Sequence, residues 1–183
     1  MKENQKSNKG KIIVGIVIAI VVIAGIAAAL ILSGGSYTDP IQAAIDITYY
    51  GDKDALEKAV PEEYFDWYEE EYGRDFEDIL DNWNNKQWVD MFGSDYKVTF
   101  KVSGKKKVEK SVLDDMRELL EDEFGIQPSK VKKAYVFDVE YFVEGSKDKD
   151  SSEWEDMYSV KIGNKWYLIE YDDDYINFSY DAW

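Results

Sequence analysis

Apolar and polar residues are distributed differently in the first 35 residues and in the rest of the chain. Residues 12–32 form an unbroken run of 21 apolar and small side chains between Lys11 and Ser33. As an α-helix this run would rise about 30 Å, which matches the hydrocarbon thickness of a bilayer. The pattern predicts a transmembrane helix. The alternative is a cleaved signal peptide, whose apolar region is usually about 7–15 residues long.

From residue 39 to about residue 92, apolar residues recur at the spacing of an α-helix. Asp39 and Pro40 fit the N-cap and the first position of a helix, and Gly51 fits its end. Pro61, Gly73 and Gly93 divide the sequence that follows. The pattern predicts four helices in this part, over about residues 39–50, 52–60, 62–72 and 75–92.

At Tyr96 the spacing changes to the two-residue period of a β-strand. A helix is predicted at 111–124, a turn at 105–107 and a loop at 145–152. The predicted strands cover about residues 96–102, 135–143, 158–162 and 165–171. Helices packed on a curved antiparallel sheet make an α+β domain. The expected fold class is therefore α+β, with an N-terminal transmembrane helix followed by helices on a curved antiparallel sheet.

Two stretches of the chain resemble the cone-shaped NTF2-like family. DPIQAAIDITYYGDKDALEKAV is similar to the helix, short loop, helix and proline that open many secreted or membrane-anchored NTF2-like domains of Gram-positive bacteria. VFDVEYFVEG and MYSVKIGNKWYLIEY resemble their last strands, where Gly-Asn precedes Lys-Trp-Tyr-Leu. The resemblance covers about residues 37–172 and implies an NTF2-like cone; a cystatin-like arrangement would give a similar pattern. Because such folds host isomerases, dehydratases, binding modules and spacers, the resemblance leaves the activity open.

Five segments follow from these patterns. They are a cytoplasmic N-terminus at 1–11, the transmembrane helix at 12–32, a linker at 33–38, an NTF2-like extracytoplasmic domain at 39–172 and an acidic aromatic tail at 173–183.

The distribution of charged residues predicts how these segments are oriented across the membrane. Residues 1–35 hold four Lys and one Glu, a net charge of +3, whereas the remaining residues hold 18 basic and 37 acidic side chains, a net charge of −19. All four lysines precede the apolar run, so the positive-inside rule places the N-terminus in the cytoplasm and the domain outside. We expect a single-pass cell-membrane protein. Its expected partners are the membrane, through residues 12–32, and an envelope protein or a cell-wall component.

Composition narrows the possible chemistry. The chain has no Cys and no His, which excludes thiol nucleophiles, imidazole catalysis and Cys- or His-ligated metals. A net charge of −19 disfavours nucleic acid as a partner, and it would repel anionic lipid headgroups as well. Asp148, Asp150 and Ser152 have the spacing of a calcium loop, but Glu153 stands where the EF-hand pattern needs Gly. No metal site, cofactor or catalytic residue is therefore assigned.

Aromatic residues supply the candidate ligand-binding positions. The chain has 28 of them, and none precedes Tyr37. Rings can stack on a carbohydrate or peptide while their polar atoms form hydrogen bonds, but they can equally build a core. Tyr64 and Trp67 lie off the main apolar stripe of their helix and are expected to be the most exposed. The ligand-binding candidates are Tyr64, Trp67, Trp83, Trp88 and Tyr141. The tail rings either dock on the domain or bind another molecule.

The predicted function is non-catalytic: binding or assembly at the bacterial cell envelope. One alternative is a small-molecule enzyme that uses Asp138 or Glu140 as a base beside a tyrosine hydroxyl in the cone cavity. The hydroxyls available for it are those of Tyr49, Tyr96, Tyr141 and Tyr158. A second alternative is a cell-wall carbohydrate binder that uses exposed rings.

Overall fold

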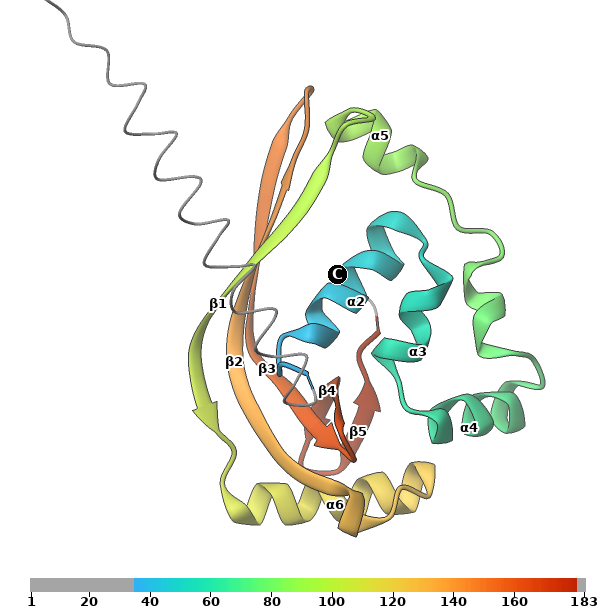
Figure 1. Cartoon of the computed structure of the whole chain (residues 1–183), viewed down its shortest axis with the longest axis vertical. Coiled ribbons are helices and arrows are strands. Elements are labelled where there is room, and N and C mark those ends of the chain that lie inside the picture. Colours follow the sequence, from blue (N-terminus) through green and yellow to red (C-terminus); the bar gives the residue numbers. More distant parts are fainter. Residues whose placement is uncertain (1–34, 181–183) are drawn as a thin grey trace, which may run out of the picture. The chain divides into compact units, whose positions relative to one another are not determined.

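Helices make up the first half of the described chain, and a sheet makes up most of the second half (Figure 1). The computed structural model describes residues 35–180, and the chain from Tyr37 onward forms one unit. In chain order the elements are α2 (Asp39–Tyr50), η1 (Lys53–Ala55), α3 (Leu56–Ala59), α4 (Glu62–Tyr72), η2 (Phe76–Leu80), α5 (Lys86–Phe92), β1 (Lys97–Lys107), α6 (Lys110–Phe124), η3 (Pro128–Lys130), β2 (Val131–Glu144), β3 (Lys149–Ile162), β4 (Lys165–Asp172) and β5 (Tyr175–Phe178).

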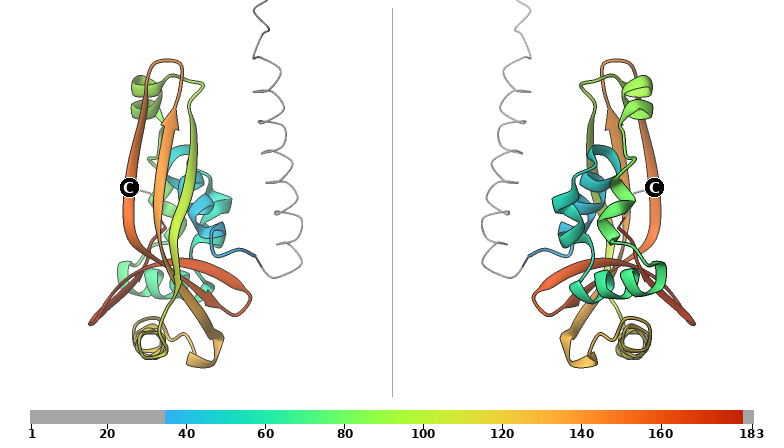
Figure 2. Two further views of the ribbon diagram at one scale, coloured as in Figure 1. Left: turned by 90° about the vertical axis from the view of Figure 1, so that its left-hand side faces the viewer. Right: turned by 90° about the vertical axis from the view of Figure 1, so that its right-hand side faces the viewer.

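All five strands form one antiparallel sheet in the order β1-β2-β3-β4-β5. β2 and β3 have 14 residues each and make the long central ladder. In side view β4 and β5 cross the ends of these long strands at a steep angle, and α6 lies beyond them (Figure 2). The sheet is therefore strongly twisted, as right-handed strand twist leads one to expect.

The sheet bends at Asp138 of β2, where the pairing with both neighbouring strands is irregular. The pairing of β1 with β2 shifts between Ser103 and Lys106, and that of β3 with β2 shifts opposite Asp138. Gly104 (φ 63°) and Asp156 (φ 52°) have left-handed backbone conformations there. The Asp156 amide donates to Asp138 Oδ1 at 3.3 Å, and a Cβ at Gly104 would lie 2.3 Å from Asp138 Oδ2. Such bulges increase local twist and bend the strands that carry them.

Helix α2 lies inside the curve of the sheet, between two hydrophobic clusters (Figure 1). Ile41, Ala44 and Ile45 belong to the cluster that includes buried residues of β1, β2 and β4, whereas Ala43 and Ile47 belong to the cluster shared by α4, α6, β4 and β5. A helix with apolar residues on most of its surface is buried on most of its surface. Gly51 ends α2 in the left-handed conformation (φ 63°), as the sequence predicts.

The helix predicted at 75–92 is interrupted. It consists of η2, a turn through Asp81 and Asn82, and α5, which begins only at Lys86. The Asn84 carboxamide accepts a hydrogen bond from the Lys86 amide at 3.2 Å. Asn and Asp side chains compete in this way with helical hydrogen bonds, and the stretch DNWNN therefore breaks the helix.

The strands extend further than their sequence pattern predicts. β1 continues through the predicted turn at 105–107, and β3 begins at Lys149, inside the predicted loop. Pairing with β2 explains both extensions, because β2 offers partners along its whole length. The tail forms β5, which pairs with β4 across a turn at Asp173 and Asp174. Among the described tail residues, Ile176 and Phe178 thus dock on the domain, which is one of the two predicted alternatives, whereas Tyr175 is exposed.

The predicted fold class requires a correction in its membrane part. Among residues 35–180 no helix is both long and apolar enough to cross a membrane; the longest there, α6, has 15 residues and charged side chains throughout. The fold class with a transmembrane helix as its first element is therefore wrong for the described chain, which is α+β. The segments predicted at 1–11 and 12–32 lie outside the described residues.

Candidate functional site

Tyr64 and Trp67, the two rings expected to be most exposed, belong to a core cluster. Tyr64 is 3% exposed, and its ring centroid lies 5.2–5.4 Å from those of Phe76, Phe124 and Phe178. Burial raises the pKa of Tyr64. Trp67 is half-buried and meets Phe124 edge-on at 5.1 Å. The expectation that Tyr64 is exposed is therefore wrong: these rings close the interface of α4 with α6 and β5.

Tyr141 is also enclosed. It is 2% exposed within the cluster of α2, α5 and the upper sheet, and burial raises its pKa, so the phenol stays protonated. Asp138 and Glu140 alternate with it on β2 and project from the other face of the strand. There Glu140 pairs in register with Lys101 of β1. The structure does not bring these carboxylates and Tyr141 into one cavity.

Trp83 and Trp88 line one groove of about 610 Å³. It lies between the C-terminal end of α2 and the segment that runs from η2 into α5. The residues around it are Ile47, Thr48, Ile79, Leu80, Asn82, Trp83, Asn84, Gln87, Trp88 and Tyr180. We call this site the amide groove, because three carboxamides border its indoles and no lining side chain is charged.

Local contacts hold the two indoles of the amide groove in place. Trp83 Nε1 donates to the Thr48 carbonyl oxygen at 3.0 Å, and the Trp83 ring lies directly over Gly51. Trp88 packs on Tyr49 with ring centroids 4.5 Å apart. The Tyr49 carbonyl accepts a hydrogen bond from the Tyr96 hydroxyl, which connects this packing to the start of β1. The rings are therefore positioned by the core before any ligand arrives.

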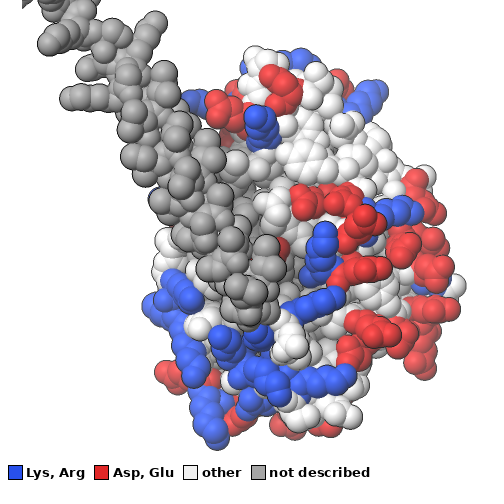
Figure 3. Space-filling model, in the orientation of Figure 1, with Lys and Arg blue, Asp and Glu red and all other residues white. Residues whose placement is uncertain are grey.

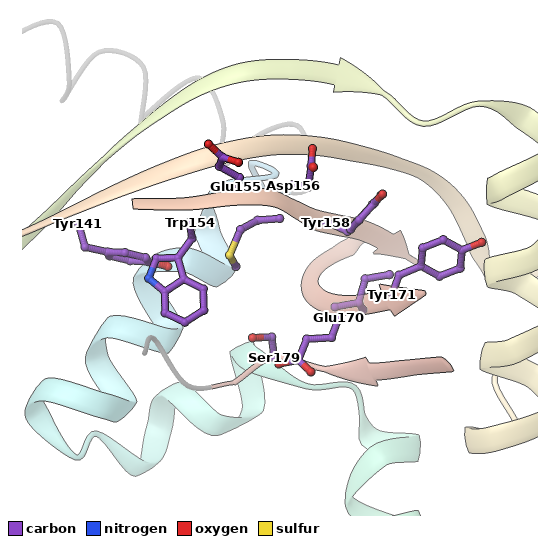
Figure 4. Close-up of a pocket in the computed structure, with 10 residues that line it drawn as sticks. Tyr141, Trp154, Glu155, Asp156, Tyr158, Glu170, Tyr171 and Ser179 are labelled. Carbon is purple, nitrogen blue, oxygen red and sulfur yellow. The ribbon is translucent and has the colours of Figure 1, made fainter. Parts of the chain in front are cut away.

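A second groove, of about 280 Å³, lies under β3 beside the bulge (Figure 4). Trp154, 40% exposed, projects into it, and Glu170 and Ser179 lie across from Trp154. Glu155 and Asp156 also border this sheet groove, but their carboxylates point to the other side of β3 (Figure 4).

Two tyrosines stand at the end of the sheet groove. Tyr158 and Tyr171 meet edge-on at 5.5 Å. Burial, followed by the nearby carboxylate of Asp156, raises the pKa of Tyr158; burial, followed by Asp115, raises that of Tyr171. Both phenols therefore remain neutral at ordinary pH. The sheet groove thus offers one exposed indole, and the buried ring of the predicted candidate Tyr141 also lines it.

The oxygen-rich stretch that begins at Asp148 is mostly strand. The Asp148 carboxylate accepts from the Lys149 amide at 2.8 Å, and Asp150 and Ser152 lie in β3, paired with Val143 and Tyr141. Within the described part of the chain, no group of three acidic side chains is arranged to hold a metal ion.

Sequence reasoning selected Trp83 and Trp88 but missed the polar residues between and beside them. The sequence pattern predicts that the run DNWNNKQW at residues 81–88 is part of a long helix, in which the amides would point in different directions. Its richness in Asn and Gln next to two Trp was the available signal. Trp154 was missed because a strand residue with polar neighbours on both sides gives no sign of a bulge.

Comparisons with known proteins give no further guide to the site. No protein-family model matches the chain, and neither curated proteins nor solved structures match it. The NTF2-like resemblance therefore stays a prediction.

Proposed function

We propose that the chain is a non-catalytic binding domain of the bacterial cell envelope, and that its ligand is a neutral carbohydrate of the cell wall held in the amide groove. The observation that carries this proposal is the combination of two fixed indoles with three carboxamides in a groove without charged lining residues. Indole faces stack on the apolar faces of sugar rings, and carboxamides both donate to and accept from sugar hydroxyls. The volume of about 610 Å³ suits one or two sugar units.

Binding accounts for the grooves better than catalysis does. Carboxylate-based hydrolysis needs two carboxyl groups facing one bound molecule. In the sheet groove the Glu155 and Asp156 carboxylates point away from Trp154, and the amide groove is lined by none (Figure 4).

The proposed location is the outer side of the cell membrane, to which the apolar residues 12–32 would tether the domain. The support for it is the sequence: four lysines precede the apolar run, and an acidic body follows. A carbohydrate of the wall would be within reach of a domain in that position.

The test is retention of the detergent-solubilised full chain on peptidoglycan stripped of its anionic polymers. We expect the variant Asn82→Ala/Gln87→Ala to bind about tenfold more weakly, because it loses two hydrogen-bonding side chains from the groove. Both residues are exposed, so the fold should be unaffected.

Two control variants make the test specific. Gln127→Ala removes an exposed amide far from the groove in the sequence, at the start of η3, and should bind like the parent chain. Trp154→Ala removes the indole of the sheet groove and should also bind normally. Undiminished binding of the double variant, or loss of binding by Trp154→Ala alone, would contradict the assignment of the amide groove.

A further inference from the structure

Lysines and aromatic rings alternate on one face of the sheet, close to the N-terminal end of α2. The rings of Tyr37, Tyr135 and Trp166 form a cluster with centroid distances of 5.4 Å, 5.4 Å and 6.4 Å. Lys105 Nζ lies 3.9 Å and 4.2 Å from the Tyr37 and Tyr135 centroids, and Lys133 Nζ lies 5.0 Å from that of Trp166. Lys161 Nζ lies 5.7 Å from the same Trp166 ring. We call these six residues the lysine–aromatic surface.

Strand register explains why the strand residues of this surface share a face. Lys133 of β2, Lys161 of β3 and Trp166 of β4 are direct neighbours across three strands. Tyr135 follows Lys133 by two residues and pairs with Lys107 of β1. Side chains that are opposite in register, or two apart on a strand, point the same way. Lys107 thus adds a fourth ammonium group to this face.

The surface is cationic although the chain as a whole is acidic. Residues 97–110 hold six Lys and one Glu, whereas α4 and its flanks hold most of the Glu residues of the helical half. In Figure 3 blue side chains gather at the lower left of the view, where β1 ends and α6 begins, and red ones gather at the right, over α3 and α4. The net charge of −19 is therefore distributed unevenly: one region of the domain is cationic, and another is strongly acidic.

The rings keep the lysines close together. Like charges placed side by side repel, and the ring faces offset part of that cost by attracting the ammonium groups. A lysine stem that lies along a ring has few conformations left to lose when its ammonium binds an anion. Three ammonium groups spread over one face of the sheet suit a layer of phosphate groups better than one small anion enclosed in a pocket.

We propose that the lysine–aromatic surface binds the phosphate headgroups of anionic phospholipids. This inference rests on the tether in the proposed function. Tyr37 lies five residues after residue 32, and five residues span at most about 18 Å, so the surface would stay within reach of the headgroups. Such a short connection gives a high effective concentration of lipid at the surface.

The amide groove would remain open while the surface is on the membrane. The lysine–aromatic surface includes Tyr37, which precedes α2, whereas the groove includes Ile47 and Thr48 near the end of that helix. The 12 residues of α2 span about 18 Å. Lipid contact at one end of α2 therefore holds the domain in an orientation that leaves the other end for a wall ligand.

The test uses the full chain in nanodiscs of phosphatidylcholine alone or with a third of phosphatidylglycerol. Acetylation of individual lysines is followed by mass spectrometry. We expect Lys105 and Lys133 to react at least threefold more slowly in the anionic discs, and about 0.5 M salt to abolish the difference. Lys58, exposed on α3, should react equally in both discs and serves as the reference.

Variants separate charge from fold. In Lys105→Glu/Lys133→Glu, protection of Lys107 by anionic lipid should be lost, whereas Lys105→Arg/Lys133→Arg should keep it. Lys58→Glu is the matched control for a change of charge elsewhere and should also keep it.

Three other outcomes would overturn the inference. A chain that enters neither kind of disc overturns the tether and the inference with it. A chain that enters both discs and reacts equally in both overturns the inference alone. Equal protection by soluble glycerol phosphate in phosphatidylcholine discs would show a site for free phosphate and would overturn the assignment to lipid.

Discussion

Gly51 and Gly73 end two helices in the same left-handed conformation, with φ of 63° and 66°, but their surroundings differ. A Cβ at Gly51 would lie 2.4 Å from atoms of the Trp83 ring, whereas a Cβ at Gly73 would meet nothing within 4 Å. Gly51 therefore has two roles, ending α2 and letting an indole of the amide groove lie on the backbone.

This pair of glycines gives a matched prediction. Gly73→Ala should lower the free energy of unfolding by about 1 kcal/mol, the cost of a left-handed alanine. Gly51→Ala should cost clearly more, because the Trp83 ring must also move and its hydrogen bond to Thr48 is strained. Urea unfolding followed by tryptophan fluorescence measures both. Equal losses of stability would mean that Trp83 is not held against Gly51.

At the scale of elements, β5 shows how a weak local pattern becomes part of the core. This four-residue strand buries Ile176 and Phe178, and the Phe178 ring lies 5.2–5.3 Å from Phe124 and Tyr64. It thus connects β4 to the aromatic cluster under α4 and α6. Tyr175 begins the same strand but is 49% exposed.

We expect Phe178→Ala to lower the free energy of unfolding by about 3–5 kcal/mol, since a fully buried ring is removed from a packed cluster. Tyr175→Ala, three positions away on the exposed side, should change it by less than about 0.5 kcal/mol. Thermal or urea unfolding of the two variants distinguishes them. A small effect of Phe178→Ala would mean that β5 is not docked in solution.

At the scale of the whole molecule, negative charge is in excess, and the charged residues are distributed unevenly over the domain. The net charge is −16, and the ion pairs among the described residues are few. One of them, Lys130 with Glu63 at 2.6 Å, joins η3 to α4. Burial is the largest single influence on Glu63 and raises its pKa, but the hydrogen bond and the charge of Lys130, together with a backbone hydrogen bond, lower that pKa on balance. Repulsion among the remaining carboxylates should exceed these local attractions at low salt.

Salt should therefore stabilise the fold. Raising NaCl from about 10 mM to about 150 mM shortens the Debye length from about 30 Å to about 8 Å. We expect the midpoint of thermal unfolding to rise by about 2–4 °C, which corresponds to about 1 kcal/mol. The same change should weaken lipid protection of Lys105, so the two effects have opposite signs. A lower midpoint in salt would mean that local ion pairs dominate.

Elements with strong local signals could be predicted from the sequence. The helix at Asp39–Tyr50 has its proline at the start and its glycine at the end, and the helix predicted at 111–124 occurs at 110–124. The interrupted helix after Asp75 and the full lengths of β1 and β3 could not, because they depend on side-chain hydrogen bonds or on pairing with β2.

The residues of the candidate site also include some that could be predicted from the sequence and some that could not. Trp83 and Trp88 were identified by residue type, but Tyr64 and Tyr141 proved to be core because of residues far away in the chain, such as Phe178 and Tyr49. The sequence by itself determined the helical and strand periods, the turns at glycines and the net charge, all of which follow from neighbouring residues. Only the tertiary structure decided which rings are exposed, which amides border one groove and where the lysines meet, because burial, grooves and charge clusters are made by non-local contacts.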